Sequence, residues 1–127
     1  MPRTHRVFIS FAMEDSYARD FLVGQARNHR SPFEFVDMSL NEPFDDRWKT
    51  RCRVRIQGCD GVIALISEHT AHATGARWEM WCARDERIPL LGVYVSKDYR
   101  PSPPPELAGC RVVEWSWDGI AHFVNSL

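Results

Sequence analysis

Glu79 lies between two tryptophans, Trp78 and Trp81, in a segment whose apolar residues recur at helical spacing. An apolar run at residues 61–66 precedes it, and the length and branched side chains of this run are typical of a strand covered on both faces. In an open α/β sheet, a helix that begins just past the carboxyl end of such a strand often carries functional residues. From the residues alone, Glu79 is either part of a site of chemistry or a solvated residue on the surface of an amphipathic helix, which is the commoner role of a helical glutamate.

Two histidines in the loop before this helix, His69 and His72, could suggest a metal site together with Glu79. A metal site needs a further ligand at a defined spacing, and the segment offers no defined third ligand. We therefore expect no bound metal and interpret both histidines as loop or surface residues.

The composition indicates a single globular domain spanning residues 1–127. Apolar residues make up 44% and charged residues 26%, and 16 basic residues face 17 acidic ones. These proportions favour neither disorder nor binding to a polyanion. The four cysteines have no C-x-x-C spacing, and we expect reduced, mostly buried thiols and a cytoplasmic location. The first residues of the chain include too few consecutive apolar side chains for an export signal, and we expect no contact with a membrane.

Strand and helix patterns alternate along the chain. The predicted strands are residues 6–11, 33–36, 61–66, 89–95 and 111–114. The predicted helices begin at the caps Asp15 or Ser16, Asp45 or Asp46, near residue 75, and Asp118. The inward-facing residues that we predict for the helices are Ala18, Phe21, Leu22, Gln25 and Ala26, then Trp48, Cys52 and Ile56, then Trp81, and finally Ile120, Phe123 and Val124. The proline-rich residues 97–106 predict an extended surface loop.

This alternation predicts an α/β fold with a five-stranded parallel sheet in the flavodoxin-like order 2-1-3-4-5 and helices on both faces, a three-layer sandwich. That order opens a crevice at the carboxyl ends of the first and third strands. The loops at residues 10–15 and 67–74 meet there, Glu79 can point into the crevice, and the loop at residues 37–44 can close over it.

The usual occupants of such a crevice do not fit these residues. A phospho-accepting response regulator needs an Asp at the end of the third strand, where this chain has Ser67. The segment after the first strand, SFAMED, lacks the Gly and Thr that cradle a phosphate. Neither G-x-G-x-x-G nor G-x-x-x-x-G-K-[ST] occurs, so hydride transfer and nucleoside triphosphate hydrolysis lose support.

The order and spacing of several motifs resemble the Toll/interleukin-1 receptor (TIR) domains, in particular the small bacterial TIR-like branch that includes Thoeris antiphage-defence proteins. The matching residues are Val7 to Phe11, then Asp60 to Ser67, then Trp78-Glu79-Met80 with Ala83, and Trp48, Arg51 and Ile56 on the second predicted helix. The resemblance implies cleavage of NAD at the nicotinamide–ribose bond, with Glu79 as the catalytic residue, NAD as substrate and no cofactor. It also implies an ADP-ribose-derived product, cyclic or conjugated in some members, that switches on a downstream effector.

One carboxylate can be enough for this reaction because nicotinamide leaves as a neutral molecule and needs no general acid. Glu79 can stabilise the oxocarbenium charge, hydrogen-bond the ribose hydroxyls or capture the sugar covalently, and the sequence leaves these three alternatives open.

The residues that we expect to contact NAD are Ser10, Phe11, Ala12, Asp15, Phe44, Arg47, Ser67 and Trp78. Phe11 and Trp78 are candidate stacking surfaces. Many members of the family carry an aromatic residue four positions before the glutamate, where this chain has Gly75, and we expect Trp78 to take that role. Arg47 is the member of a basic helical stripe nearest the crevice; we interpret the rest of the stripe as a solvated helix face and expect no nucleic-acid binding.

Two classes of function fit these observations. The first is an NAD-consuming enzyme, which Glu79 favours; the second is a non-catalytic TIR-type interaction module. Both can self-associate, and catalysis can depend on that assembly.

Overall fold

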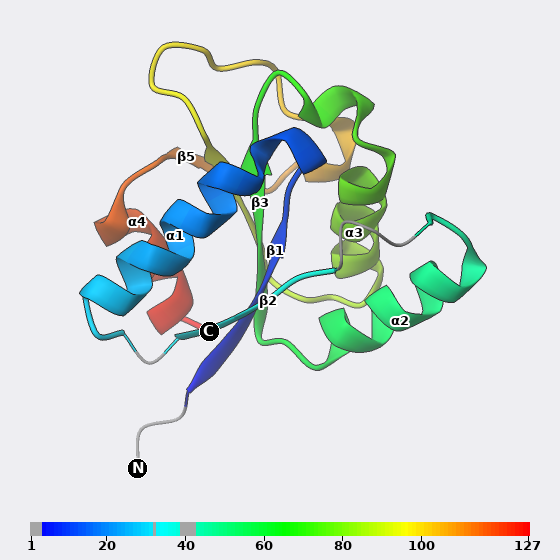
Figure 1. The fold of residues 1–127 in the computed structure, drawn as a ribbon, viewed down its shortest axis with the longest axis horizontal. Helices are drawn as coiled ribbons and strands as arrows, with labels where there is room; N and C mark the ends of the chain where they lie inside the picture. The colour runs from blue at the N-terminus through cyan, green and yellow to red at the C-terminus, as the bar shows by residue number, and fades with distance from the viewer. Residues whose placement is uncertain (1–3, 32, 39–42) are drawn as a thin grey trace.

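The computed structural model describes residues 4–31, 33–38 and 43–127. Within them lies one parallel sheet in the order β2-β1-β3-β4-β5 (Figure 1), which confirms the predicted strand order. The strands are β1 (His5–Ser10), β2 (Phe33–Val36), β3 (Gly61–Ile66), β4 (Leu90–Tyr94) and β5 (Arg111–Glu114). The middle of the loop that we predicted to close over the crevice, residues 39–42, lies outside the described residues.

The helices in the described residues are α1 (Ser16–Asn28), α2 (Asp46–Gln57), α3 (Thr74–Asp85) and α4 (Trp117–Asn125), with short 3-10 helices η1 (Met13–Asp15), η2 (Thr70–His72) and η3 (Pro105–Leu107). The last of these ends the proline-rich segment, which we predicted to be irregular throughout. Leu107 is buried there against α3 and explains the short turn, because an apolar anchor fixes the backbone around it. None of the described helices is long and apolar enough to cross a membrane.

Two helix layers sandwich the sheet, α1 and α4 on one face and α2 and α3 on the other (Figure 1). Alternate strand residues face the two layers: Val7 and Ile9 pack toward α1 and α4, whereas Phe8 packs toward α2. All six residues of β3 are buried, as its continuous apolar run predicted. The flavodoxin-like three-layer fold is therefore as the sequence predicted.

Two details of the helices differ from the prediction. Phe21, which we placed in the apolar stripe of α1, is 60% exposed, because the buried positions of the helix are Ala18, Leu22 and Ala26. The cap of α4 is Ser116, whose hydroxyl accepts a hydrogen bond from the Gly119 backbone at 3.0 Å. Asp118 lies inside the first turn instead.

Gly92 in β4 gives a prediction for the stability of the sheet. A Cβ atom at this position would lie 2.9 Å from the Ile66 side chain and 3.1 Å from that of Val112, both inside the packed sheet face. Because overpacking forces buried side chains to move, Gly92→Ala should destabilise the protein by about 1–3 kcal/mol. Urea unfolding measures this, with Gly24→Ala on α1, where a Cβ meets no atom within 4 Å, as the control. Equal stability of the two variants would contradict the packing described for β4.

Candidate active site

The Glu79 side chain is buried, with 5% of its surface exposed, on the face of α3 that looks toward the end of β1. The Ser10 hydroxyl donates a hydrogen bond to Glu79 Oε1 at 2.9 Å. On the other side, the Cys52 thiol of α2 lies 3.9 Å from Oε2. The carboxyl group is thus held between two neutral donors from two different elements, and no cation stands among these contacts.

Burial raises the pKa of Glu79 to about 8, because a charged carboxylate loses its hydration in this position. The hydrogen bond from Ser10 opposes the rise, and the charge of Asp37 adds to it. The single Ser10 proton has a second acceptor, the Ala76 carbonyl oxygen at 3.0 Å. A protonated Glu79 can therefore donate to Ser10 while Ser10 donates to Ala76, and an ionised Glu79 can take the Ser10 proton for itself. The site accommodates both protonation states.

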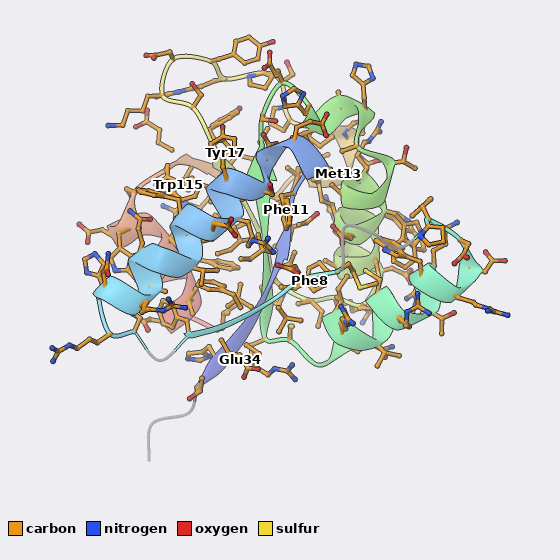
Figure 2. The ribbon with its side chains drawn as sticks, in the orientation of Figure 1. Phe8, Phe11, Met13, Tyr17, Glu34 and Trp115 are labelled. Atoms are coloured by element: carbon orange, nitrogen blue, oxygen red, sulfur yellow. The ribbon has the colours of Figure 1, made fainter. Side chains whose placement is uncertain are left out.

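A cavity of about 270 Å³ opens beside Glu79, which we call the Glu79 cavity. It is lined by Phe11, Ala12, Met13, Glu14, Met38, Phe44, Trp48, Ala73, Thr74, Gly75, Ala76 and Glu79. Figure 2 shows Phe11 and Met13 at the carboxyl end of β1, beside the start of α1. The lining therefore comes from the predicted crevice, and its described residues include two carboxylates and no basic side chain.

Trp48, not Trp78, is the indole that lines this cavity. A Cβ atom on Gly75 would lie 3.7 Å from two atoms of the Trp48 ring, so the ring fits against the bare glycine. Trp48 on α2 thus supplies an aromatic surface next to the position where the family aromatic was expected. Sequence reasoning had assigned Trp48 to the core.

Trp78 lies in a second hollow next to the Glu79 cavity, which we call the tryptophan hollow. It is lined by Phe44, Lys49, Ala71, His72, Thr74, Arg77, Trp78, Trp81 and Glu106. Trp81, which we predicted to be core, is 46% exposed there. The sheet-facing positions of α3 are taken by Met80, Cys82 and Ala83, and this turns Trp81 outward.

Asp15 and Ser67 join the two loops of the crevice to each other. The Ser67 hydroxyl donates to the Asp15 carboxylate and accepts from the His69 backbone at 3.0 Å. Burial raises the pKa of Asp15, which is 1% exposed, while the bond from Ser67 opposes that rise. Neither side chain is among those that line the Glu79 cavity, although we predicted both as contacts of NAD.

Three of the predicted NAD contacts, Phe11, Ala12 and Phe44, line the Glu79 cavity, and a fourth, Ser10, donates a hydrogen bond to Glu79. Arg47 is exposed on α2 and lines neither hollow. Met13, Glu14 and Met38 lie in loops that we predicted to form the crevice, although we did not name them as individual contacts. Sequence reasoning assigned Cys52 to the core and not to the site. All four cysteines are free thiols, and the described part of the chain has no group of three His, Cys, Asp or Glu side chains that could hold a metal ion.

The family described as Thoeris protein ThsB, TIR-like domain, matches residues 8–100, which include Ser10 at the end of β1, all of β3 and the helix α3 that carries Glu79. The chain belongs to this family. It is therefore a TIR-type domain of the Thoeris antiphage class, as its motifs indicated. Comparison with curated protein sequences gives no match.

Solved structures similar to this Thoeris TIR-like domain share its fold. The SEFIR domain of IL-17 receptor B aligns with a TM-score of 0.66 at 11% identity, over 98% of this chain and 96% of that one. A prokaryotic SEFIR domain aligns with a TM-score of 0.57 at 12% identity, over 97% and 89%. A 3-dehydroquinate dehydratase-like protein from Bifidobacterium longum aligns with a TM-score of 0.55 at 13% identity, over 97% and 94%. At such identities the likeness concerns the fold alone.

Proposed function

We propose that this TIR-like domain cleaves NAD between nicotinamide and ribose, and that its ADP-ribose-derived product signals to a downstream effector in antiphage defence. The observation that carries the proposal is the buried Glu79 carboxyl beside a cavity at the switch point of the sheet. Family membership supports the same assignment.

The lining of the Glu79 cavity suits the cationic half of NAD. Phe11, Phe44 and Trp48 supply aromatic rings, and the titratable groups in the lining, Glu14 and Glu79, are both acidic. A nicotinamide ring with its positive charge is attracted by carboxylates and by aromatic faces alike. An anionic phosphate would be repelled from the same cavity, which gives the bound dinucleotide a direction.

The protonation of Glu79 then becomes part of the reaction. With a pKa of about 8, Glu79 is mostly protonated at neutral pH in the free protein. A cation entering the cavity favours the ionised form, and Ser10 can turn its proton to the carboxylate. When the bond to ribose breaks, nicotinamide leaves with the bonding electrons, and the carboxylate faces the positive charge that develops on the sugar. Water or a hydroxyl of the same molecule then completes the product and releases a proton.

The rate of nicotinamide release should therefore rise with pH. Because the ionised form of Glu79 is the active one, kcat/KM of the free enzyme should increase through an apparent pKa near 8 and level off above it. Ser10→Ala removes a bond that lowers this pKa, so its profile should move to higher pH. The measurement is a pH–rate profile from pH 6 to 9.5 for both proteins. A flat profile, or one that falls over this range, would contradict a catalytic Glu79 carboxylate.

An interaction module is the second candidate, and one observation favours it. The outer face of α1 exposes Tyr17 at 64% and Phe21 at 60%, close to Trp115 (Figure 2). Exposed aromatic groups of this kind are common at protein interfaces. They lie on the α1 layer, across the sheet from α3, so assembly through this face and catalysis at Glu79 are compatible.

A further inference from the structure

The tryptophan hollow and the Glu79 cavity are neighbours. Phe44 and Thr74 line both of them, so a molecule held in one can reach into the other. The hollow has a volume of about 650 Å³, within the range of roughly 300–1,000 Å³ that is usual for ligand sites. The reaction at Glu79 uses only the first cavity, which leaves the second without a role.

Two indoles form one wall of the hollow. The ring centroids of Trp78 and Trp81 are 5.8 Å apart, and the Arg53 guanidinium lies 5.9 Å and 5.5 Å from their respective centroids. Arg53 on α2 forms ion pairs with Asp85 and Glu86 at the end of α3. These ion pairs fix the guanidinium beside the two indoles and so restrict their movement. A braced, exposed indole offers a rigid face on which a planar ring can stack at low entropic cost.

The charges of the two cavities are opposite in character. The hollow contains Lys49 and Arg77, and its carboxylate, Glu106, binds Arg77 through contacts of 2.9–3.1 Å. Lys49 stands at the shared boundary, with its ammonium 5.0 Å from the centroid of the Phe44 ring. The basic charge of Lys49 therefore lies on the hollow side of the boundary, and the acidic Glu79 and Glu14 lie on the other.

We infer that the tryptophan hollow binds the purine nucleoside diphosphate half of the substrate, with the purine stacked on Trp81 and Trp78 and the diphosphate beside Lys49. A dinucleotide with a cationic pyridinium at one end carries groups that complement these surfaces in the same order: a cation, a diphosphate and a planar base. The direction of the dinucleotide rests on the proposed function, which places nicotinamide at Glu79. Binding of a nucleoside diphosphate in the hollow needs no catalysis.

ADP is the probe that separates these two questions, because it has no nicotinamide bond to cleave. Isothermal titration calorimetry with ADP should show binding to the wild-type protein. The affinity of Trp81→Ala for ADP should be lower by about tenfold or more, which is the usual effect of removing a stacking aromatic side chain. Phe21→Ala is the matched control, since Phe21 is an exposed aromatic on the α1 layer; its affinity for ADP should equal that of the wild type. Lys49→Gln should weaken ADP binding severalfold and reduce its dependence on salt concentration.

Circular dichroism checks that Trp81→Ala keeps its fold. If this variant is unfolded, the ADP titration of Lys49→Gln decides whether the tryptophan hollow binds ADP. No ADP binding by the wild type, or equal affinity for ADP in the wild type, Trp81→Ala and Lys49→Gln, would overturn the inference whether or not NAD is cleaved. If ADP binding depends on Trp81 but NAD is not cleaved, the hollow is supported as a nucleotide site, and only the proposed function is contradicted.

Discussion

Glu79→Gln is expected to stabilise the fold by about 3 kcal/mol at pH 7, equivalent to a rise in Tm of roughly 10 °C. The ordinary pKa of a glutamate, 4.5, is raised to about 8 by burial of Glu79, so at neutral pH the folded state must hold a proton that the unfolded chain has released. Glutamine has the shape of the protonated side chain and avoids this cost. A catalytic residue that destabilises its own fold is a common cost of function.

The sign of the effect depends on pH in a testable way. Below about pH 4.5 the carboxyl is protonated in both states, so the variant gains nothing; the gain grows as pH rises to about 8 and is constant above. Glu106→Gln is the control of opposite sign. Burial alone would raise the pKa of Glu106, but the hydrogen bonds from Arg77 lower it, so this substitution should destabilise the protein at neutral pH. Thermal unfolding of the three proteins at pH 4, 6 and 8 measures this, and equal Tm values for wild type and Glu79→Gln at pH 8 would contradict the buried site.

The fold could be predicted because each level of the sequence indicates the same answer. The run from Gly61 to Ile66 is apolar at every position, which specifies a central strand buried on both faces. Alternation of strands and helices with short links then restricts the sheet to few orders, because crossovers are right-handed. The same order predicted that the loops after β1 and β3 meet near Glu79, and the hydrogen bond from Ser10 at the end of β1 to Glu79 on α3 lies at that place.

The aromatic lining could not be predicted, because it depends on how each helix is rotated and how α2 packs on α3. Periodicity assigned Trp48 and Trp81 to the core alike. Trp48 is buried as predicted and its ring also reaches the Glu79 cavity over Gly75, whereas Trp81 is turned to solvent. The contact of Cys52 with Glu79 has the same origin: the sequence places Cys52 inward and lets Glu79 point into the crevice, and only helix packing brings the two side chains within 3.9 Å.

Loss of NAD cleavage in Glu79→Gln is the second large effect that we expect. The substitution keeps the size of the side chain and removes the charge that faces the developing oxocarbenium ion, whichever of the three roles the carboxylate has. Removing a single preorganised group from a transition state typically costs about 100–1,000-fold in rate, and losing a full charge in a buried site lies at the upper end. We therefore expect at least a roughly thousandfold fall in the rate of nicotinamide release.

Glu34→Gln is the matched control for this loss. Glu34 is an exposed carboxylate on β2, and Figure 2 shows it at the opposite end of the sheet from Phe11 and Met13. The same substitution there replaces a carboxyl group by an amide of the same size and leaves the site untouched. Its rate of nicotinamide release should equal that of the wild type.

The central claim is tested most directly by nicotinamide release from NAD by the wild type, Glu79→Gln and Glu34→Gln at several protein concentrations, with products resolved by mass spectrometry. We predict release by the wild type and by Glu34→Gln, none above background by Glu79→Gln, and a product with the mass of ADP-ribose or one water less. Equal release by Glu79→Gln, or no release by any of the three proteins at any concentration, would contradict the enzyme and leave the interaction module as the better description of this domain.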